Sequence, residues 1–230
     1  MRERLEAVRA QIAAAGSDPA GVSVIAVTKG FPTEVVDAAL GAGLADLGEN
    51  YAQELVAKAE ELAGRAAPTG QAAAADAVAV PRWQFIGHLQ RNKVRRLAAH
   101  VHRFQSVDRP ELVDELVRRA PGARVLLQVN TTGEAQKAGC SPEAVGPLLE
   151  GARAGGLVVE GLMTVGPTQA GAPARPAFAA LRGLVDRFGL EVCSMGMTDD
   201  LDVAVGEGST MIRVGRALFG PRPRREATAG

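Results

Sequence analysis

A lysine follows the first apolar run of the chain, in a place where its amine could do covalent chemistry. The run from Val22 to Thr28 is rich in β-branched residues, is followed by Lys29 and is closed by Gly30 and Pro32. This pattern is typical of a buried strand. In parallel α/β folds the carboxyl ends of the strands face the ligand site, and an amine in partly apolar surroundings loses some preference for its charged form. A neutral amine can form a Schiff base with a carbonyl ligand, whereas the alternative is a lysine that merely extends into water.

Two glycine-containing segments near the end of the chain could hold a phosphate group. The segment Ser194–Asp200 contains Gly196, and the segment Met211–Arg216 contains Gly215. Glycine lets backbone amides approach a ligand closely, and a Thr or Asp that caps the next helix leaves amides that favour an anion. The loops after the seventh and eighth strands of a barrel are a recurrent phosphate site, although ordinary turn chemistry would explain each segment alone.

Arg213 is the third candidate, because it lies inside an otherwise apolar strand. Its neighbours are Ile212 and Val214, and successive side chains of a strand point to opposite faces. We therefore expect Arg213 to point at the same site, or at a partner carboxylate.

The elements that would position these residues alternate between strand and helix. We expect eight strands, at Val22–Thr28, Ala45–Leu47, Trp83–Ile86, Arg103–Val107, Arg124–Asn130, Leu157–Thr164, Leu190–Met195 and Thr210–Val214. Helical patterns are expected at Thr33–Leu40, Tyr51–Leu62, Gln90–Ala99, Pro110–Arg119, Ser141–Gly151, Arg175–Phe188 and Asp199–Gly206. This alternation predicts an α/β fold with parallel strands, and eight repeats close most naturally into a (β/α)8 TIM barrel. An open doubly wound sheet is the alternative, and it is disfavoured because the GxGxxG turn does not follow the first strand.

Length and composition predict a single domain. The 230 residues fit one barrel, over residues 1–220, with an extra N-terminal helix that ends near Gly16. The Ala-rich stretch 63–80 is expected to be a flexible surface insertion, and residues 221–230 a disordered tail.

The 26 basic and 26 acidic residues balance, so no global charge attracts nucleic acid or a membrane. The charged start, the two widely separated cysteines and the lack of a membrane-length apolar run predict a cytoplasmic protein.

Several blocks of the sequence together resemble the pyridoxal phosphate homeostasis protein family. They are Ala26–Lys29, Gly48–Tyr51, Trp83–Lys93, Gly161–Thr164, Ser194–Met197, Gly208–Gly215 and Phe219–Gly220. The blocks are in order and cover almost the whole chain. The resemblance implies a single-domain barrel like the N-terminal domain of alanine racemase, with pyridoxal 5'-phosphate bound as a covalent aldimine on Lys29.

The same resemblance implies which residues contact the cofactor. Arg213 would face the pyridine nitrogen, where a permanently charged guanidinium keeps that nitrogen unprotonated and weakens the ring as an electron sink. Ser194, Gly215 and the amide of Arg216 would hold the phosphate, and Asn50 would line the site. The family commonly has Thr where Arg216 stands, so a hydroxyl contact to the phosphate is replaced here by the guanidinium or by backbone alone. The Ala-rich insertion is also longer than the family pattern.

The resemblance implies a protein that carries and buffers the cofactor and regulates its intracellular level, without robust turnover and with no catalytic residues. Its partners would be pyridoxal phosphate and the apoenzymes that receive it, and the chain would be a monomer. The alternative is an amino-acid racemase of the alanine racemase type, for which Tyr51, the sole tyrosine, would have to supply the second base.

A third hypothesis is a nucleic-acid or protein adaptor, and it rests only on the basic helix around Arg91 and Lys93. A solvated helix face is the better interpretation of that segment, because no aromatic residue interleaves with the basic ones. His100 and His102 could share a strand face, yet no third metal ligand has suitable spacing, so no metal site is predicted.

Overall fold

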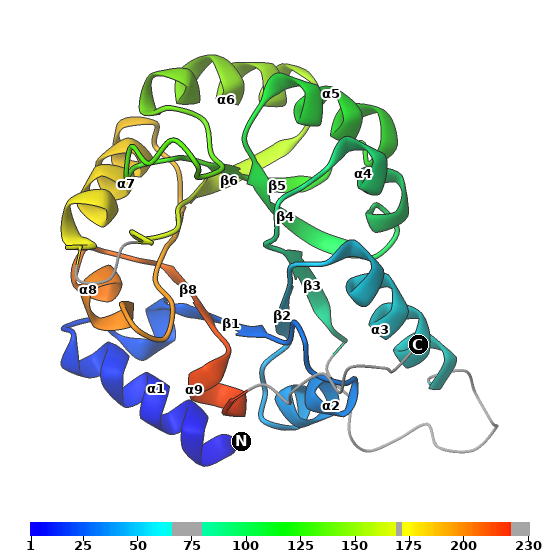
Figure 1. Cartoon of the computed structure of the whole chain (residues 1–230), viewed down its shortest axis with the longest axis vertical. Coiled ribbons are helices and arrows are strands. Elements are labelled where there is room, and N and C mark those ends of the chain that lie inside the picture. Colours follow the sequence, from blue (N-terminus) through cyan, green and yellow to red (C-terminus); the bar gives the residue numbers. More distant parts are fainter. Residues whose placement is uncertain (66–79, 169–171, 222–230) are drawn as a thin grey trace.

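The strands form one closed barrel in sequence order, from β1 to β8 (Figure 1). The computed structural model describes residues 1–65, 80–168 and 172–221. The strands are β1 Ser23–Val27, β2 Asp46–Glu49, β3 Arg82–Phe85, β4 Val101–Val107, β5 Arg124–Gln128, β6 Val158–Met163, β7 Val192–Ser194 and β8 Met211–Val214. All neighbours are parallel, and β1 closes the barrel by pairing with β8 in the register Ser23↔Met211. The predicted TIM barrel is therefore confirmed.

Helices surround the barrel and connect its strands (Figure 1). They are α1 Arg2–Ala14, α2 Glu34–Gly41, α3 Ala52–Arg65, α4 Arg91–Leu97, α5 Pro110–Arg119, α6 Val145–Ala154, α7 Arg175–Arg187, α8 Leu201–Gly206 and α9 Arg216–Phe219, with 3-10 turns η1 Pro19–Gly21 and η2 Pro142–Ala144. The N-terminal helix α1 packs beside α8 and α9. Leu5, Val8 and Ile12 are its buried residues, and their spacing places them on one helical face.

Each predicted strand is present, and the differences lie mainly at element ends. The helix expected at Ser141–Gly151 begins with the η2 turn, and α6 follows it from Val145. The short helix α9 was not expected. Helix α3 extends to Arg65, into the stretch expected to be an insertion, and Arg65 pairs there with Asp37 at 2.8 Å. A cation in the last turn of a helix interacts favourably with the helix dipole and so stabilises the helix.

Two predictions fall largely outside the described residues. The proposed insertion 63–80 includes residues 66–79, and the proposed tail 221–230 includes residues 222–230. Among the helices that the structure describes, none combines the length and the apolar character that crossing a membrane would require.

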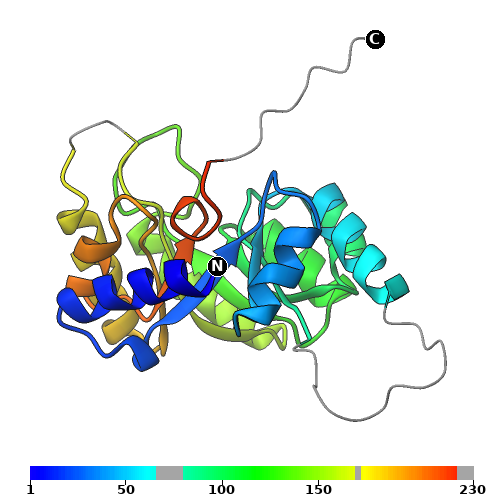
Figure 2. The same ribbon diagram turned by 90° about the horizontal axis from the view of Figure 1, so that it is seen from below.

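The barrel has an apolar layer outside and a partly polar interior. The main hydrophobic core lies between the strands and the surrounding helices. A smaller apolar cluster contains Ile25, Leu126, Met163 and Met211. Buried polar side chains fill other positions in the strands, among them Gln84, Gln105, Ser194 and Arg213. Viewed from the side, α9 and the loops after β5 and β6 lie at one end of the barrel (Figure 2).

Candidate functional site

A pocket of about 330 Å³ opens at the carboxyl ends of the strands. Its lining comes from strand ends and the loops that follow them: Val27, Lys29, Asn50, Ile86, Val165, Met197, Thr198, Asp199, Arg213, Gly215 and Arg216. This is the end of a (β/α)8 barrel where ligand sites are built, and the volume suits a small organic ligand. Five of the six residues predicted to bind the cofactor line it, and Ser194 does not.

Lys29 and Asn50 reach the pocket from neighbouring strands. Lys29 is the second residue after the end of β1 and is half-buried, and Asn50 directly follows β2. The Asn50 Oδ1 atom is buried, and the described residues offer it no hydrogen-bond partner. A buried acceptor without a partner is costly, so this oxygen is suited to a donor that a ligand or water supplies.

Behind Lys29 lies a buried cluster of charged residues that the sequence analysis missed. The ammonium of Lys58, on α3, donates to the carbonyl of Thr28 at 2.7 Å, to Glu49 Oε1 at 2.6 Å and to Glu54 Oε1 at 2.9 Å. The Thr28 hydroxyl also donates to Glu49 Oε1, at 2.7 Å. Burial raises the pKa of the Glu49 carboxyl, although the Lys58 ammonium acts in the opposite direction. The only indication in the sequence was that Glu49 and Lys58, both charged, occupy positions that the hydrophobic pattern predicts to be buried.

Arg213 points into the barrel, as predicted, and is almost fully buried. Its Nη1 atom donates to Ser194 Oγ at 2.7 Å, and its Nη2 atom donates to the carbonyl of Thr164, also at 2.7 Å. Burial lowers the pKa of Arg213 to about 10, while Asp200 and Cys193 act in the opposite direction. The side chain therefore stays a cation at neutral pH.

Ser194 lies beneath Arg213 rather than in the lining of the pocket. Its hydroxyl donates to Gln105 Oε1 at 2.8 Å and accepts from Arg213. Gln105 in turn donates to Gln84 Oε1 at 3.1 Å, and Gln84 donates to Asp46 at 2.8 Å. The predicted contact of this hydroxyl with a phosphate stays a prediction, and the structure gives the hydroxyl another role, that of holding Arg213.

The other end of the pocket is formed by the segments after β7 and β8. Gly196 has φ +95°, and a Cβ there would lie 2.5 Å from Ala204 Cβ, so the turn requires glycine. Gly215 precedes α9, and a Cβ there would come within 3.3 Å of the Val27 carbonyl. The Arg216 guanidinium pairs with Asp199 across the rim, so this side chain is engaged by the loop after β7.

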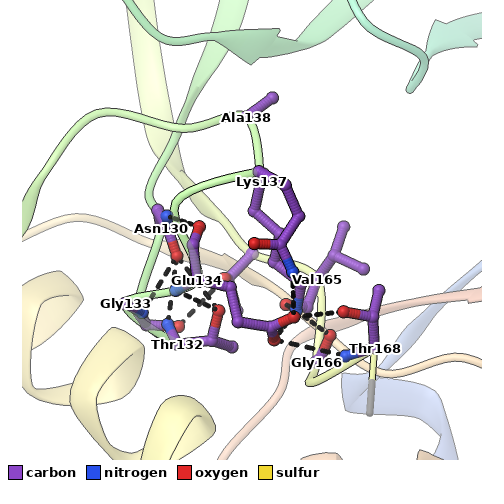
Figure 3. A network of polar contacts seen from close by, with 12 residues as sticks. Asn130, Thr132, Gly133, Glu134, Lys137, Ala138, Val165, Gly166 and Thr168 are labelled. Carbon is purple, nitrogen blue, oxygen red and sulfur yellow. Dashed lines mark hydrogen bonds and ion pairs between the residues drawn. The ribbon is translucent and has the colours of Figure 1, made fainter.

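Polar contacts join the loop after β5 to the loop after β6 (Figure 3). Lys137 pairs with Glu134 at 2.9 Å and donates to the carbonyl of Val165 at 3.3 Å. The hydroxyl of Thr168 donates to Glu134 as well. These contacts lower the pKa of Glu134 to about 2, with the hydrogen bond from Thr168 as the largest cause. Because Val165 lines the pocket, this junction fixes one of its walls.

Other candidates from the sequence lie elsewhere. Tyr51 is 61% exposed and does not line the pocket. His88 is exposed. Within the described ranges, no three His, Cys, Asp or Glu side chains lie together as a metal site would need. Val165 also lines the pocket and was not predicted from the sequence, where its position just beyond β6 was the available signal.

Comparison with known proteins agrees with this geometry. A model of the alanine racemase N-terminal domain matches residues 4–223. The pyridoxal phosphate homeostasis protein of Pseudomonas aeruginosa is 42% identical over 224 residues, which span 94% of this chain and 91% of that protein. The structure of PipY from Synechococcus elongatus PCC7942 with PLP bound superposes with a TM-score of 0.76 at 30% identity, covering 95% of this chain and 99% of PipY.

An enzyme shares the fold at much lower identity. Alanine racemase from Clostridium difficile 630 superposes with a TM-score of 0.70 at 13% identity, and the match covers 97% of this chain but 58% of the racemase. This likeness shows the barrel alone. The chain therefore belongs to the pyridoxal phosphate homeostasis protein family, built on the barrel of the alanine racemase N-terminal domain.

Proposed function

We propose that this protein binds pyridoxal 5'-phosphate in the pocket at the end of β1 and carries and buffers the cofactor for other proteins. The observation that carries the proposal is the convergence of Lys29, Asn50, Arg213 and Gly215 on one small cavity. Relatives named for pyridoxal phosphate homeostasis, and PipY with PLP bound, support the same ligand.

The residues present fit this cofactor. The cavity offers a lysine amine, a buried amide oxygen without a partner among the described residues, and a glycine where the backbone comes close. Pyridoxal phosphate supplies an aldehyde that condenses with a neutral amine to an imine and water. Lys29 is the residue that we assign to this attachment. We assign the phosphate to the backbone at Gly215 and Arg216, where α9 begins.

Arg213 makes carrying the cofactor a better proposal than catalysis. Its guanidinium is held by Ser194 and Thr164 and remains charged at neutral pH. This cation would oppose protonation of the ring nitrogen of a bound cofactor, so the ring would withdraw electrons weakly from an amino acid and the Cα proton would be removed slowly.

The racemase alternative lacks an evident second base. Racemization through two bases needs an acid–base group on the ring face opposite Lys29. Tyr51 is 61% exposed and is not among the residues that line the cavity. The lining, as described, includes no Tyr, His or Cys, and its one carboxylate, that of Asp199, pairs with Arg216. This composition supports a protein without robust turnover. We further propose that the protein is a monomer that hands the cofactor to apoenzymes. We also propose that it acts in the cytoplasm, and the two buried free cysteines are consistent with such a reducing compartment.

The test uses the purified full-length protein and pyridoxal phosphate. We expect a visible absorbance band from a covalent adduct that borohydride reduces, with the label on Lys29 among the four lysines at positions 29, 58, 93 and 137. We also expect no alanine racemization at ordinary enzyme rates, about 1–1000 per second. Absence of binding would overturn the proposal, and racemization at such rates would make the protein a catalyst.

A further inference from the structure

We infer that Glu54 and Lys58 of α3 are positioning residues that hold the backbone on both sides of Lys29. The inference deepens the proposed function and rests on it, because it concerns how the attachment amine is presented. Neither residue needs to contact the cofactor. The inference rests on the hydrogen bonds that these two side chains make with the peptide groups on either side of Lys29.

Each flanking peptide group has its own charged partner. The carbonyl of Thr28, just before Lys29, accepts from the Lys58 ammonium at 2.7 Å. The amide of Gly30, just after Lys29, donates to Glu54 Oε1 at 2.6 Å. Hydrogen bonds in which one partner is ionised are about twice as strong as neutral ones. Lys29 is thus the residue between two charge-assisted anchors.

The two anchors are joined to each other and to the neighbouring strand. Lys58 and Glu54 lie one turn apart on α3 and pair at 2.9 Å. Lys58 also pairs with Glu49, a fully buried residue at the end of β2. Asn50 follows Glu49 and lines the pocket. The cluster therefore ties the two strand ends that present Lys29 and Asn50 to a single helix.

Burial makes this arrangement specific. The Lys58 side chain is 6% exposed and that of Glu49 is 0% exposed, so neither charge has water as an alternative partner. Removing one partner leaves the other charge buried and uncompensated. The backbone on both sides of Lys29 is therefore held in one conformation. This matters because a displacement of about 1 Å at a reacting group can lower a reaction rate about 100-fold.

Glu54 offers the sharpest test, because its side chain is partly accessible and its removal leaves Lys58 with Glu49. We compare Glu54→Ala, which removes the acceptor of the Gly30 amide, with Glu54→Gln, which keeps an oxygen there. Glu60→Ala is the matched control, since Glu60 is an exposed carboxylate on the same helix. The double variant Lys58→Met with Glu49→Gln removes both buried charges together and tests the anchor at Thr28.

The first readouts use the protein without cofactor. In Glu54→Ala, hydrogen exchange of the Gly30 amide should accelerate about tenfold, as loss of a hydrogen bond to a charged group predicts. The rate at which Lys29 is acetylated, and the pH at which that rate reaches half its maximum, should change as well. Glu54→Gln keeps a neutral acceptor and should therefore restore both in part, and Glu60→Ala should match the unmodified protein. Unchanged exchange and acetylation in Glu54→Ala would overturn the inference.

The second readout is the affinity for pyridoxal phosphate, which should fall about tenfold or more in Glu54→Ala and in the double variant. Equal affinity in all variants would also overturn the inference. Failure of the unmodified protein to bind the cofactor would instead overturn the proposed function, and the two failures are therefore distinguishable. Thermal unfolding of each variant separates altered presentation of Lys29 from general loss of the fold.

Discussion

The guanidinium of Arg213 donates a 2.7 Å hydrogen bond to the hydroxyl of Ser194, and both side chains are buried inside the barrel. The same hydroxyl donates to Gln105 on β4, from which the hydrogen-bonded chain continues to Gln84 on β3. Ser194 therefore belongs to a polar chain that crosses the barrel and ends at a cation in the pocket. Among the residues that the structure describes, no carboxylate pairs with Arg213, so this chain and the Thr164 carbonyl hold the cation in place.

Replacing Ser194 by Ala tests that chain. The change leaves one donor of Arg213 and the Oε1 atom of Gln105 without their partner, so the free energy of unfolding should fall by about 1–3 kcal/mol. Urea denaturation measures it. Ser23→Ala is the control, because Ser23 lies exposed at the start of β1 and its loss should change the free energy by less than about 0.5 kcal/mol. Equal stability of the two variants would show that the Ser194 contacts contribute nothing.

Lys29→Ala should abolish the reducible adduct with pyridoxal phosphate while the barrel stays folded. Lys29 is half-buried at a strand end, outside the hydrophobic core, so the free energy of unfolding should change by less than about 1 kcal/mol. Absorbance, borohydride reduction and peptide mapping check the adduct, and circular dichroism checks the fold. Lys93→Ala, on α4, should bind like the unmodified protein. A reducible adduct retained in Lys29→Ala would place the attachment on another lysine.

Stability should depend on pH through Glu134. Its pKa is about 2 in the folded protein against an ordinary value of 4.5, so the folded chain binds fewer protons than the unfolded chain between these values. The contribution of Glu134 is therefore present above about pH 4.5 and is lost as the pH falls toward about 2. Denaturation curves of the unmodified protein and of Glu134→Gln should differ near neutral pH and converge in acid.

The control for this titration is Glu150→Gln, which removes an exposed carboxylate of α6. Its free energy of unfolding should differ from that of the unmodified protein by less than about 0.5 kcal/mol, as for an ordinary surface substitution. A Glu134→Gln curve that stayed parallel to that of the unmodified protein down to about pH 2 would contradict the assignment of the titration to Glu134.

The eight strands could be predicted because their apolar runs are local features of the sequence. Lys29, Asn50 and Gly215 could be placed together because the strand ends of a closed barrel meet at one edge. The partner of Ser194 could not be predicted, since Gln105 lies 89 residues away and inward positions meet only when the barrel closes. The pairing of Glu49 with Lys58 was missed for a related reason, because it depends on how α3 packs on β2.

Replacing Arg213 by Glu should raise the rate at which the loaded protein exchanges the Cα proton of an added amino acid. An anion in place of the guanidinium favours protonation of the ring nitrogen, and a protonated ring withdraws electrons more strongly. Loss of the contacts with Ser194 and Thr164 should lower cofactor affinity at the same time, so exchange is compared per bound cofactor. Deuterium incorporation into alanine, followed by NMR, measures it. Arg153→Glu is the matched control, because Arg153 is exposed on α6 and does not line the pocket. Equal exchange in the two variants would show that Arg213 does not act on the ring nitrogen.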